Sequence, residues 1–211
     1  MNLNSLIDYT CLKADATRET IEKLADTAMQ HGFAAVCILP IWVKLAAQKL
    51  SRSPVKTCSV VAFPLGSNLS LTKAQEAEIL VTFGAQEIDM VLPIGPLKER
   101  DYAYVLQDIK SVVQASAACP VKVILETCLL TDDEKITACQ LAMDAGAAFV
   151  KTSTGFSKGG ATLHDVALMR KTVGPTFGVK ASGGISTPSF AQELIHAGAN
   201  RIGTSSLLSS S

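Results

Sequence analysis

The sequence predicts an α/β protein, a single (β/α)8 TIM barrel that occupies residues 1–211 and has short loops. Short apolar runs alternate with amphipathic stretches along the whole chain, as in barrels of parallel strands surrounded by helices. No tight turn between two alternating runs signals an antiparallel hairpin. With 211 residues, 48% hydrophobic and 18% charged, the chain suffices for one large core but is too short for two comfortable domains.

The strands are expected at the short apolar runs, which lie at residues 6–11, 34–39, 58–63, 87–92, 121–126, 147–151, 177–181 and 201–204. Helices are expected between them, near residues 17–31, 41–50, 70–83, 97–117, 132–145, 163–172 and 188–197. Several helix starts carry capping signals, such as the spacing of Thr131 and Glu134 and the position of Pro188. Gly32 and Gly146 stand where a helix ends before the next strand.

An open, doubly wound sheet is the alternative arrangement for the same alternation of strands and helices. Such a sheet would be expected to carry a glycine-rich phosphate turn after its first strand. The turn at residues 12–17 reads LKADAT and contains no glycine, so the barrel is favoured. Barrels of this type usually contain about 250 residues, and this shorter one is therefore expected to bind a small substrate.

Charge and composition exclude several classes of function. The 19 basic residues balance the 19 acidic ones, so no global field would recruit nucleic acid or an anionic membrane. The 6 cysteines include no Cys-x-x-Cys pair, which is typical of free buried thiols in a reducing compartment. The 3 histidines lie far apart, so no metal site is expected. No signal core or bilayer-spanning stretch occurs, and a soluble cytoplasmic protein is expected.

The most unusual stretch is FVKTSTGF at residues 149–156. Lys151 follows an apolar run typical of a buried parallel strand, and small hydroxyl residues and a glycine come directly after it. A buried ammonium is costly unless it is paired or partly neutral, and lysines neutralised by burial serve as amine nucleophiles. A single such lysine is more often a strand-end residue that reaches solvent. A second stretch of the same kind, FGVKASGG at 177–184 with Lys180, favours the chemical interpretation.

Polar residues that interrupt the strands are candidates for the site, because barrel sites lie at the C-terminal ends of the strands. The two lysines fall on the sixth and seventh expected strands, and Asp8, Asp89 and Glu126 fall on the first, fourth and fifth. A second ammonium about 5 Å away, at an effective dielectric near 20, destabilises the first by about 3 kcal/mol. One lysine can therefore help to neutralise the other. A structural ion pair is the alternative role for Asp89.

Glycine-rich loops after the last strands predict a phosphate site. Barrels often bind phosphate with the backbone N–H groups of the loops after strands seven and eight. The candidates are Gly183, Gly184, Gly203, Ser205 and Ser206, with Gly155 after the sixth strand. A lone glycine pair would indicate only a turn, but two such loops on adjacent strands favour a phosphate cradle. The serine-rich end at 205–211 is expected to be too short for a full last helix.

Motifs along nearly the whole chain resemble those of the bacterial deoxyribose-phosphate aldolases, a family of class I Schiff-base aldolases. These motifs are IDYT at 7–10, AVCILP at 35–40, VVAFPLG at 60–66, EIDMV at 87–91, KVILET at 122–127, VKTSTGF at 150–156, VKASGGI at 179–185 and IGTSS at 202–206. Either lysine motif alone is moderately specific, and the two together are highly specific.

The resemblance implies reversible cleavage of 2-deoxy-D-ribose 5-phosphate into acetaldehyde and D-glyceraldehyde 3-phosphate. It implies that Lys151 is the Schiff-base lysine, Lys180 the neighbour that tunes it, and Asp89 the acid/base that works with a bound water. The implied substrate-binding residues are Asp8, Thr10 and Thr154. Neither a metal nor an organic cofactor is implied, because the iminium is the electron sink. The implied partners are the phosphosugar and acetaldehyde, without nucleic acid or membrane; the oligomeric state stays open, with a homodimer among the arrangements.

Some positions depart from the family pattern. Tyr9 stands where histidine is frequent, Ala62 where glycine is common, and Pro93 where asparagine is common. Ser186 stands where a basic residue often follows Gly-Gly-Ile, and the loss of that charge concerns phosphate binding and not the chemistry. Lys158 is the hypothesised compensating cation.

Two other functions stay open on the residues alone. One is another phosphosugar enzyme, such as a further imine-forming aldolase or an isomerase that uses Asp89 and Glu126 as a proton-transfer pair. The other is a sugar-phosphate-binding barrel without turnover, although a mere binder has no use for a neutralised lysine. Cys37, near the expected mouth, is either a small buried residue or a thiol that unsaturated aldehydes alkylate.

Overall fold

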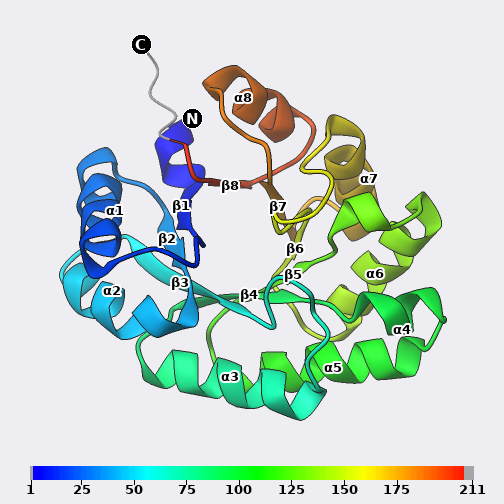
Figure 1. Cartoon of the computed structure of the whole chain (residues 1–211). Helices are drawn as coiled ribbons and strands as arrows, with labels where there is room; N and C mark the ends of the chain where they lie inside the picture. Colours follow the sequence, from blue (N-terminus) through cyan, green and yellow to red (C-terminus); the bar gives the residue numbers. More distant parts are fainter. Residues whose placement is uncertain (1, 207–211) are drawn as a thin grey trace.

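The protein is a closed barrel of parallel strands, seen in a computed structural model that describes residues 2–206. Each strand pairs with the next one in the sequence, and β8 closes the barrel by pairing with β1. Figure 1 shows the helices arranged as a ring around these strands. The barrel prediction is confirmed, and the open doubly wound sheet is wrong.

The strands are short, and all are parallel. Their bounds are β1 (Ile7–Cys11), β2 (Ala35–Ile38), β3 (Lys56–Val61), β4 (Glu87–Val91), β5 (Val121–Ile124), β6 (Phe149–Lys151), β7 (Gly178–Ser182) and β8 (Arg201–Thr204). The helices are α1 (Arg18–His31), α2 (Val43–Leu50), α3 (Ser70–Thr82), α4 (Ile94–Lys98), α5 (Tyr102–Ala115), α6 (Asp132–Asp144), α7 (Leu163–Val173) and α8 (Pro188–His196). Residues 2–206 also contain three short 3-10 helices: η1 (Leu3–Leu6), η2 (Pro40–Trp42) and η3 (Thr127–Leu129).

Side chains at the helix starts satisfy backbone N–H groups that have no partner within the helix. Thr131 and Glu134 form a capping box at α6, as their spacing predicted, and Pro188 occupies the first turn of α8. Gly32 ends α1 in the left-handed conformation, with φ of 65°, which costs glycine little. These local signals explain why most element boundaries were predictable.

The single helix expected at 97–117 is wrong, because the structure has two helices there. α4 ends at Lys98, and Arg100 takes a left-handed conformation with φ of 62°, which a right-handed helix cannot contain. Asp101 then caps α5 by accepting a hydrogen bond from the backbone N–H of Tyr104. Residues 98–101 at this break are all charged and include neither glycine nor proline, so no helix-breaking residue marked it in the sequence.

Two strands end two residues before the expected position. β5 ends at Ile124, and Glu126 takes a left-handed conformation with φ of 45°. β3 ends at Val61, and Ala62 follows with φ of 53°. Non-glycine residues rarely adopt this conformation, so both positions turn the chain sharply at the mouth of the barrel.

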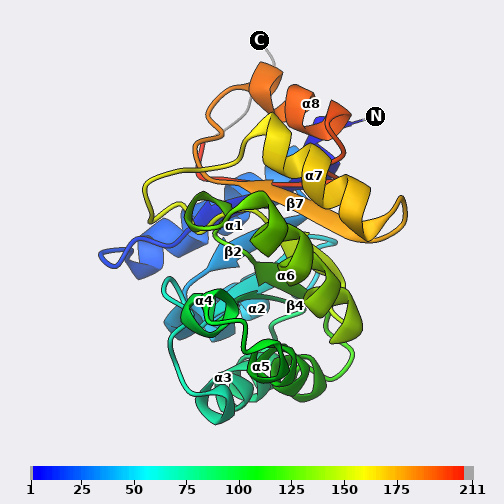
Figure 2. The ribbon, with the colours of Figure 1, turned by 90° about the vertical axis from the view of Figure 1, so that its right-hand side faces the viewer.

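Apolar packing fills the space between the strands and the helices, whereas the barrel interior is largely polar. One continuous cluster of buried apolar side chains joins the sheet to the surrounding helices. Figures 1 and 2 both show α3 and α5 side by side on the outside of this layer. Inside the barrel a second cluster is small and consists of Leu12, Ala35, Cys37, Cys58 and Val60. None of the helices in residues 2–206 combines the length and the apolar character needed to span a bilayer.

Candidate active site

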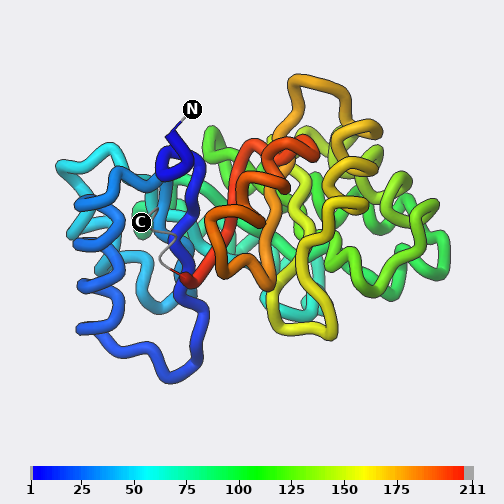
Figure 3. Tube along the Cα trace, turned by 90° about the horizontal axis from the view of Figure 1, so that it is seen from above, coloured from blue at the N-terminus to red at the C-terminus, as the bar shows by residue number. Residues whose placement is uncertain are grey.

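The C-terminal ends of the strands surround a cavity of about 920 Å³. Figure 3 shows the loops that follow β1 and β6 extending to the same side of the barrel. Nine predicted site residues line the cavity: Thr10, Lys151, Thr154, Gly155, Gly183, Gly184, Gly203, Ser205 and Ser206. The other three, Asp8, Asp89 and Lys180, are 0% exposed and lie behind this lining.

Lys151 lies at the boundary between the cavity and the barrel interior. It is the last residue of β6, its side chain is 3% exposed, and its Nζ donates a hydrogen bond to Asp89 Oδ2 at 2.8 Å. Lys180 is its direct partner on β7 and donates to the same oxygen at 2.7 Å. The two lysine nitrogens are therefore no further apart than the sum of these distances. The structure brings both lysines and Asp89 together, as the sequence indicated.

Asp89 belongs to a larger group of charged side chains inside the barrel. Its Oδ1 accepts a hydrogen bond from Lys122 at 2.8 Å, and Lys122 also pairs with Glu87 at 2.6 Å. Arg201 lies 2.7 Å from an oxygen of Asp8 and 3.2 Å from one of Glu87. We call this group the buried ion cluster; its members are Asp8, Glu87, Asp89, Lys122, Lys151, Lys180 and Arg201.

The charged groups of the buried ion cluster keep one another ionised. Burial would raise the pKa of Asp89, but the three neighbouring ammoniums outweigh burial and hold this pKa well below its usual range. Burial would lower the pKa of Lys180, but the carboxylates of Asp8 and Asp89 raise it above the usual range of lysine. Lys180 is thus a permanent positive charge beside Lys151.

Three members of the cluster were missed in the sequence: Glu87, Lys122 and Arg201. Lys122 interrupts an apolar strand as Asp89 and Lys180 do, and it is buried. The cost of burying an unpaired charge was therefore a signal that would have found it. Glu87 and Arg201 gave no such signal, because each is the first residue of its strand, and a charged residue at that position is usually solvated.

The two predicted substrate-binding threonines are held in place by neighbouring acidic residues. Thr10 Oγ1 donates to the backbone oxygen of Asp8 at 2.9 Å. The Thr154 hydroxyl donates to the carboxylate of Glu126, which is 3% exposed and also accepts the Thr154 backbone N–H at 3.4 Å. Glu126 therefore orients Thr154 toward the cavity. Because the Glu126 carboxylate is hydrogen-bonded to Thr154, the structure gives no support to Glu126 and Asp89 as the proton-transfer pair of an isomerase.

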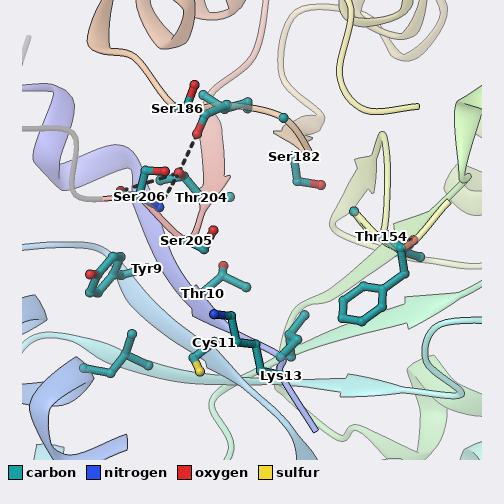
Figure 4. Close-up of a pocket in the computed structure, with 18 of the residues that line it drawn as sticks. Tyr9, Thr10, Cys11, Lys13, Thr154, Ser182, Ser186, Thr204, Ser205 and Ser206 are labelled. Atoms are coloured by element: carbon teal, nitrogen blue, oxygen red, sulfur yellow. Dashed lines mark hydrogen bonds between the residues drawn. The ribbon is translucent and has the colours of Figure 1, made fainter. Parts of the chain in front are cut away.

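The predicted phosphate residues form a compact set of loops, which we call the phosphate cradle (Gly155, Gly183, Gly184, Gly203, Ser205 and Ser206). Gly183 and Gly184 take left-handed conformations with φ of 90° and 75°. Figure 4 shows Ser182, Ser186 and Thr204 around the same space. Thr204 Oγ1 donates to the backbone oxygen of Ile185 at 2.6 Å and accepts the Ser206 N–H at 3.0 Å, which joins the loops after β7 and β8. The rest of the predicted serine tail, 207–211, lies outside the described residues.

The structure defines the positions of three residues whose roles the sequence left undecided. Ser186 lines the cavity, whereas Lys158 is exposed and is not among the described residues that line it. Lys158 therefore does not compensate for Ser186 from inside the cavity. Cys37 is 0% exposed, with its Sγ 3.9 Å from Asp89 Oδ2, so it is a small buried residue of the barrel interior.

A barrel with lysine amines on both sides of a buried carboxylate, at the floor of a cavity, has the arrangement typical of imine-forming aldolases. Sequence comparison gives the particular family. The profile described as DeoC/LacD family aldolase matches residues 5–210. The deoxyribose-phosphate aldolase of Streptococcus suis (strain 98HAH33) is 57% identical over 206 residues, which cover 98% of this chain and 94% of that protein. The corresponding aldolase of Brevibacillus brevis is 55% identical and covers 98% and 93%.

Solved structures agree with the sequence comparison. An aldolase named QR15 superposes with a TM-score of 0.94 at 38% identity, over 98% of this chain and 92% of that one. The deoxyribose phosphate aldolase of Aeropyrum pernix, described as a unique tetramer, superposes with a TM-score of 0.90 at 34% identity, over 97% and 87%. The chain belongs to the DeoC/LacD family of aldolases. The resemblance drawn from the motifs is confirmed, and the isomerase alternative is wrong.

Proposed function

We propose that this aldolase reversibly cleaves 2-deoxy-D-ribose 5-phosphate into acetaldehyde and D-glyceraldehyde 3-phosphate through a Schiff base on Lys151. The relatives that share more than half of its residues are named for deoxyribose phosphate. The cavity supplies the two parts that such a substrate needs, an amine at its floor and glycine-rich loops at its side. The observation that carries the assignment is the charge balance of the buried ion cluster.

The buried ion cluster contains three carboxylates and four basic groups, so it is electrically balanced when one basic group is uncharged. Lys122, Lys180 and Arg201 each lie within 4 Å of at least two carboxylates, which holds them charged. Lys151 pairs with one carboxylate among the described residues, and of the cluster it alone lines the cavity. Lys151 is therefore the amine of the cluster that a substrate in the cavity meets.

The reaction begins when the neutral amine of Lys151 adds to the C1 aldehyde, and loss of water gives a protonated imine. The C3 hydroxyl then loses its proton, the C2–C3 bond breaks, and its electron pair forms an enamine with the imine as electron sink. Glyceraldehyde 3-phosphate leaves, the enamine takes up a proton at C2, and hydrolysis releases acetaldehyde and the free amine. Asp89 accepts hydrogen bonds from Lys151 and Lys180, and its lowered pKa keeps it ionised, so the carboxylate holds both amines in position and stabilises the protonated imine. Its expected acid/base role with a bound water stays a prediction.

The phosphate cradle is placed to hold the other end of the substrate. Its loops follow β6, β7 and β8, the region where barrels often bind phosphate through backbone N–H groups. The left-handed glycines let the backbone approach an anion closely. Asp8 acts indirectly in this scheme, by fixing the charge of Lys180 and the orientation of Thr10.

The test is trapping of the imine with borohydride after addition of acetaldehyde, followed by peptide mapping and an assay of cleavage. The adduct is expected on Lys151, and Lys151→Leu is expected to abolish both adduct and turnover. Lys158→Leu removes an exposed lysine from the loop that follows β6; it is the matched control and is expected to keep both. A trapped adduct on another lysine, or binding of the sugar phosphate without turnover, would contradict the proposal. A homodimer remains a prediction, to be tested by light scattering.

A further inference from the structure

The cavity extends beyond the proposed reaction centre toward α1, where it is lined by charged residues that the reaction does not use. Three lysines line the cavity: Lys13, Lys23 and Lys151. Lys23 pairs with Glu19, which also lines the cavity, at 2.7 Å. Lys151 pairs with Asp89, as described above. Lys13, by contrast, forms no ion pair with any carboxylate of residues 2–206.

Lys13 lines the same cavity as the phosphate cradle. It lies two residues after the end of β1, and β1 pairs with β8 so that Tyr9 is the partner of Thr204. The loop after β1 therefore adjoins the cradle residue Ser205, on the opposite side of β8 from Ser186. Figure 4 shows the Lys13 side chain extending into the cavity toward Thr10 and Ser205.

We propose that Lys13 supplies the positive charge for the phosphate of the substrate, in the place of the basic residue that is absent at Ser186. This inference rests on the proposed function of the site. The phosphate cradle offers backbone N–H groups and hydroxyls, which are neutral, whereas a phosphate monoester carries up to two negative charges near pH 7. A flexible ammonium acts on such an anion as a point charge and needs no fixed hydrogen-bond geometry.

The charge of Lys13 acts on the phosphate end of the substrate and not on the reacting carbon. Its loss is therefore expected to weaken binding of phosphorylated ligands alike in the ground state and in the transition state. Uniform binding of this kind appears in KM and leaves kcat unchanged. Because Lys13 is exposed, the effect is expected to be moderate, about tenfold, and to shrink as salt is added.

The experiment compares the wild type with Lys13→Met, using 2-deoxyribose 5-phosphate and unphosphorylated 2-deoxyribose as substrates. Lys13→Met is expected to raise KM for the phosphorylated sugar about tenfold with kcat within twofold, and to leave cleavage of 2-deoxyribose unchanged. Adding Ser186→Arg to Lys13→Met is expected to restore the low KM, since it returns a cation to the other flank of the cradle. Lys158→Met is the control and is expected to change neither substrate.

Calorimetric binding of inorganic phosphate separates this inference from the proposed function. A tenfold loss of phosphate affinity in Lys13→Met supports the role of Lys13 even if the wild type does not cleave the sugar phosphate. Unchanged phosphate affinity, or equal losses for the phosphorylated and unphosphorylated sugars, would overturn it.

Discussion

Replacing Lys180 with methionine tests the electrostatic basis of the site most directly. The amines of Lys151 and Lys180 lie 2.8 and 2.7 Å from one oxygen of Asp89. Two positive charges about 5 Å apart, at an effective dielectric near 20, repel by about 3 kcal/mol. Lys180→Met removes this repulsion, so addition of the Lys151 amine to an aldehyde at pH 7 is expected to slow roughly a hundredfold.

Borohydride trapping measures the rate of this addition. The rate of trapping with acetaldehyde is expected to fall roughly a hundredfold at pH 7 in Lys180→Met. Lys180→Arg keeps the positive charge and is expected to lose much less.

The matched control is Lys73→Met, which removes another buried lysine. Lys73 is 0% exposed and pairs with Asp108 at 2.7 Å outside the barrel, between α3 and α5. Loss of one partner of such a pair typically costs about 3–5 kcal/mol of stability. Lys73→Met is therefore expected to lower the melting temperature without changing the rate of trapping by the folded protein. A trapping rate in folded Lys180→Met within threefold of the wild type at pH 7, or an equal loss in Lys180→Arg, would refute the reasoning.

Three further outcomes follow from the structure. Gly160→Ala is expected to raise KM for the phosphorylated sugar, because a Cβ there would lie 2.2 Å from the backbone oxygen of Gly183 and displace the phosphate cradle. Equal KM values for the wild type and the variant would show that the loop accommodates the methyl group. The carboxylates Asp8 and Asp89 have lowered pKa values, so they stabilise the folded state above about pH 4, and the free energy of unfolding in urea is expected to fall as the pH drops below that value. Burial raises the pKa of Cys139 to about 12, so this thiol is expected to react with a disulfide reagent at pH 8 only after unfolding, as mass spectrometry of the native protein would show.

The sequence predicted the site best where a charged residue interrupts an apolar strand. Lys151 and Lys180 interrupt apolar strands, and the alternation of strands and helices then places both at one end of a barrel. Lys122 also interrupts an apolar strand, but it was overlooked because no small hydroxyl residues and glycine follow it directly. Arg100 was not predictable, since arginine carries no preference for the left-handed conformation that divides α4 from α5. The sequence also does not show how far a flexible side chain reaches. For that reason Lys158, and not Lys13 after β1, was expected to compensate for the missing charge at Ser186.

The buried ion cluster joins strands from opposite ends of the chain. Asp8 lies on the first strand, while its partners Lys180 and Arg201 lie on the last two. A partly assembled barrel that lacks β7 and β8 would leave Asp8 with few counter-charges, and an uncompensated buried carboxylate is strongly unfavourable. Stable fragments are consequently disfavoured, and folding should proceed as one cooperative event. The residues that give the enzyme its reactive amine thus also make completion of the whole ring a condition for stability.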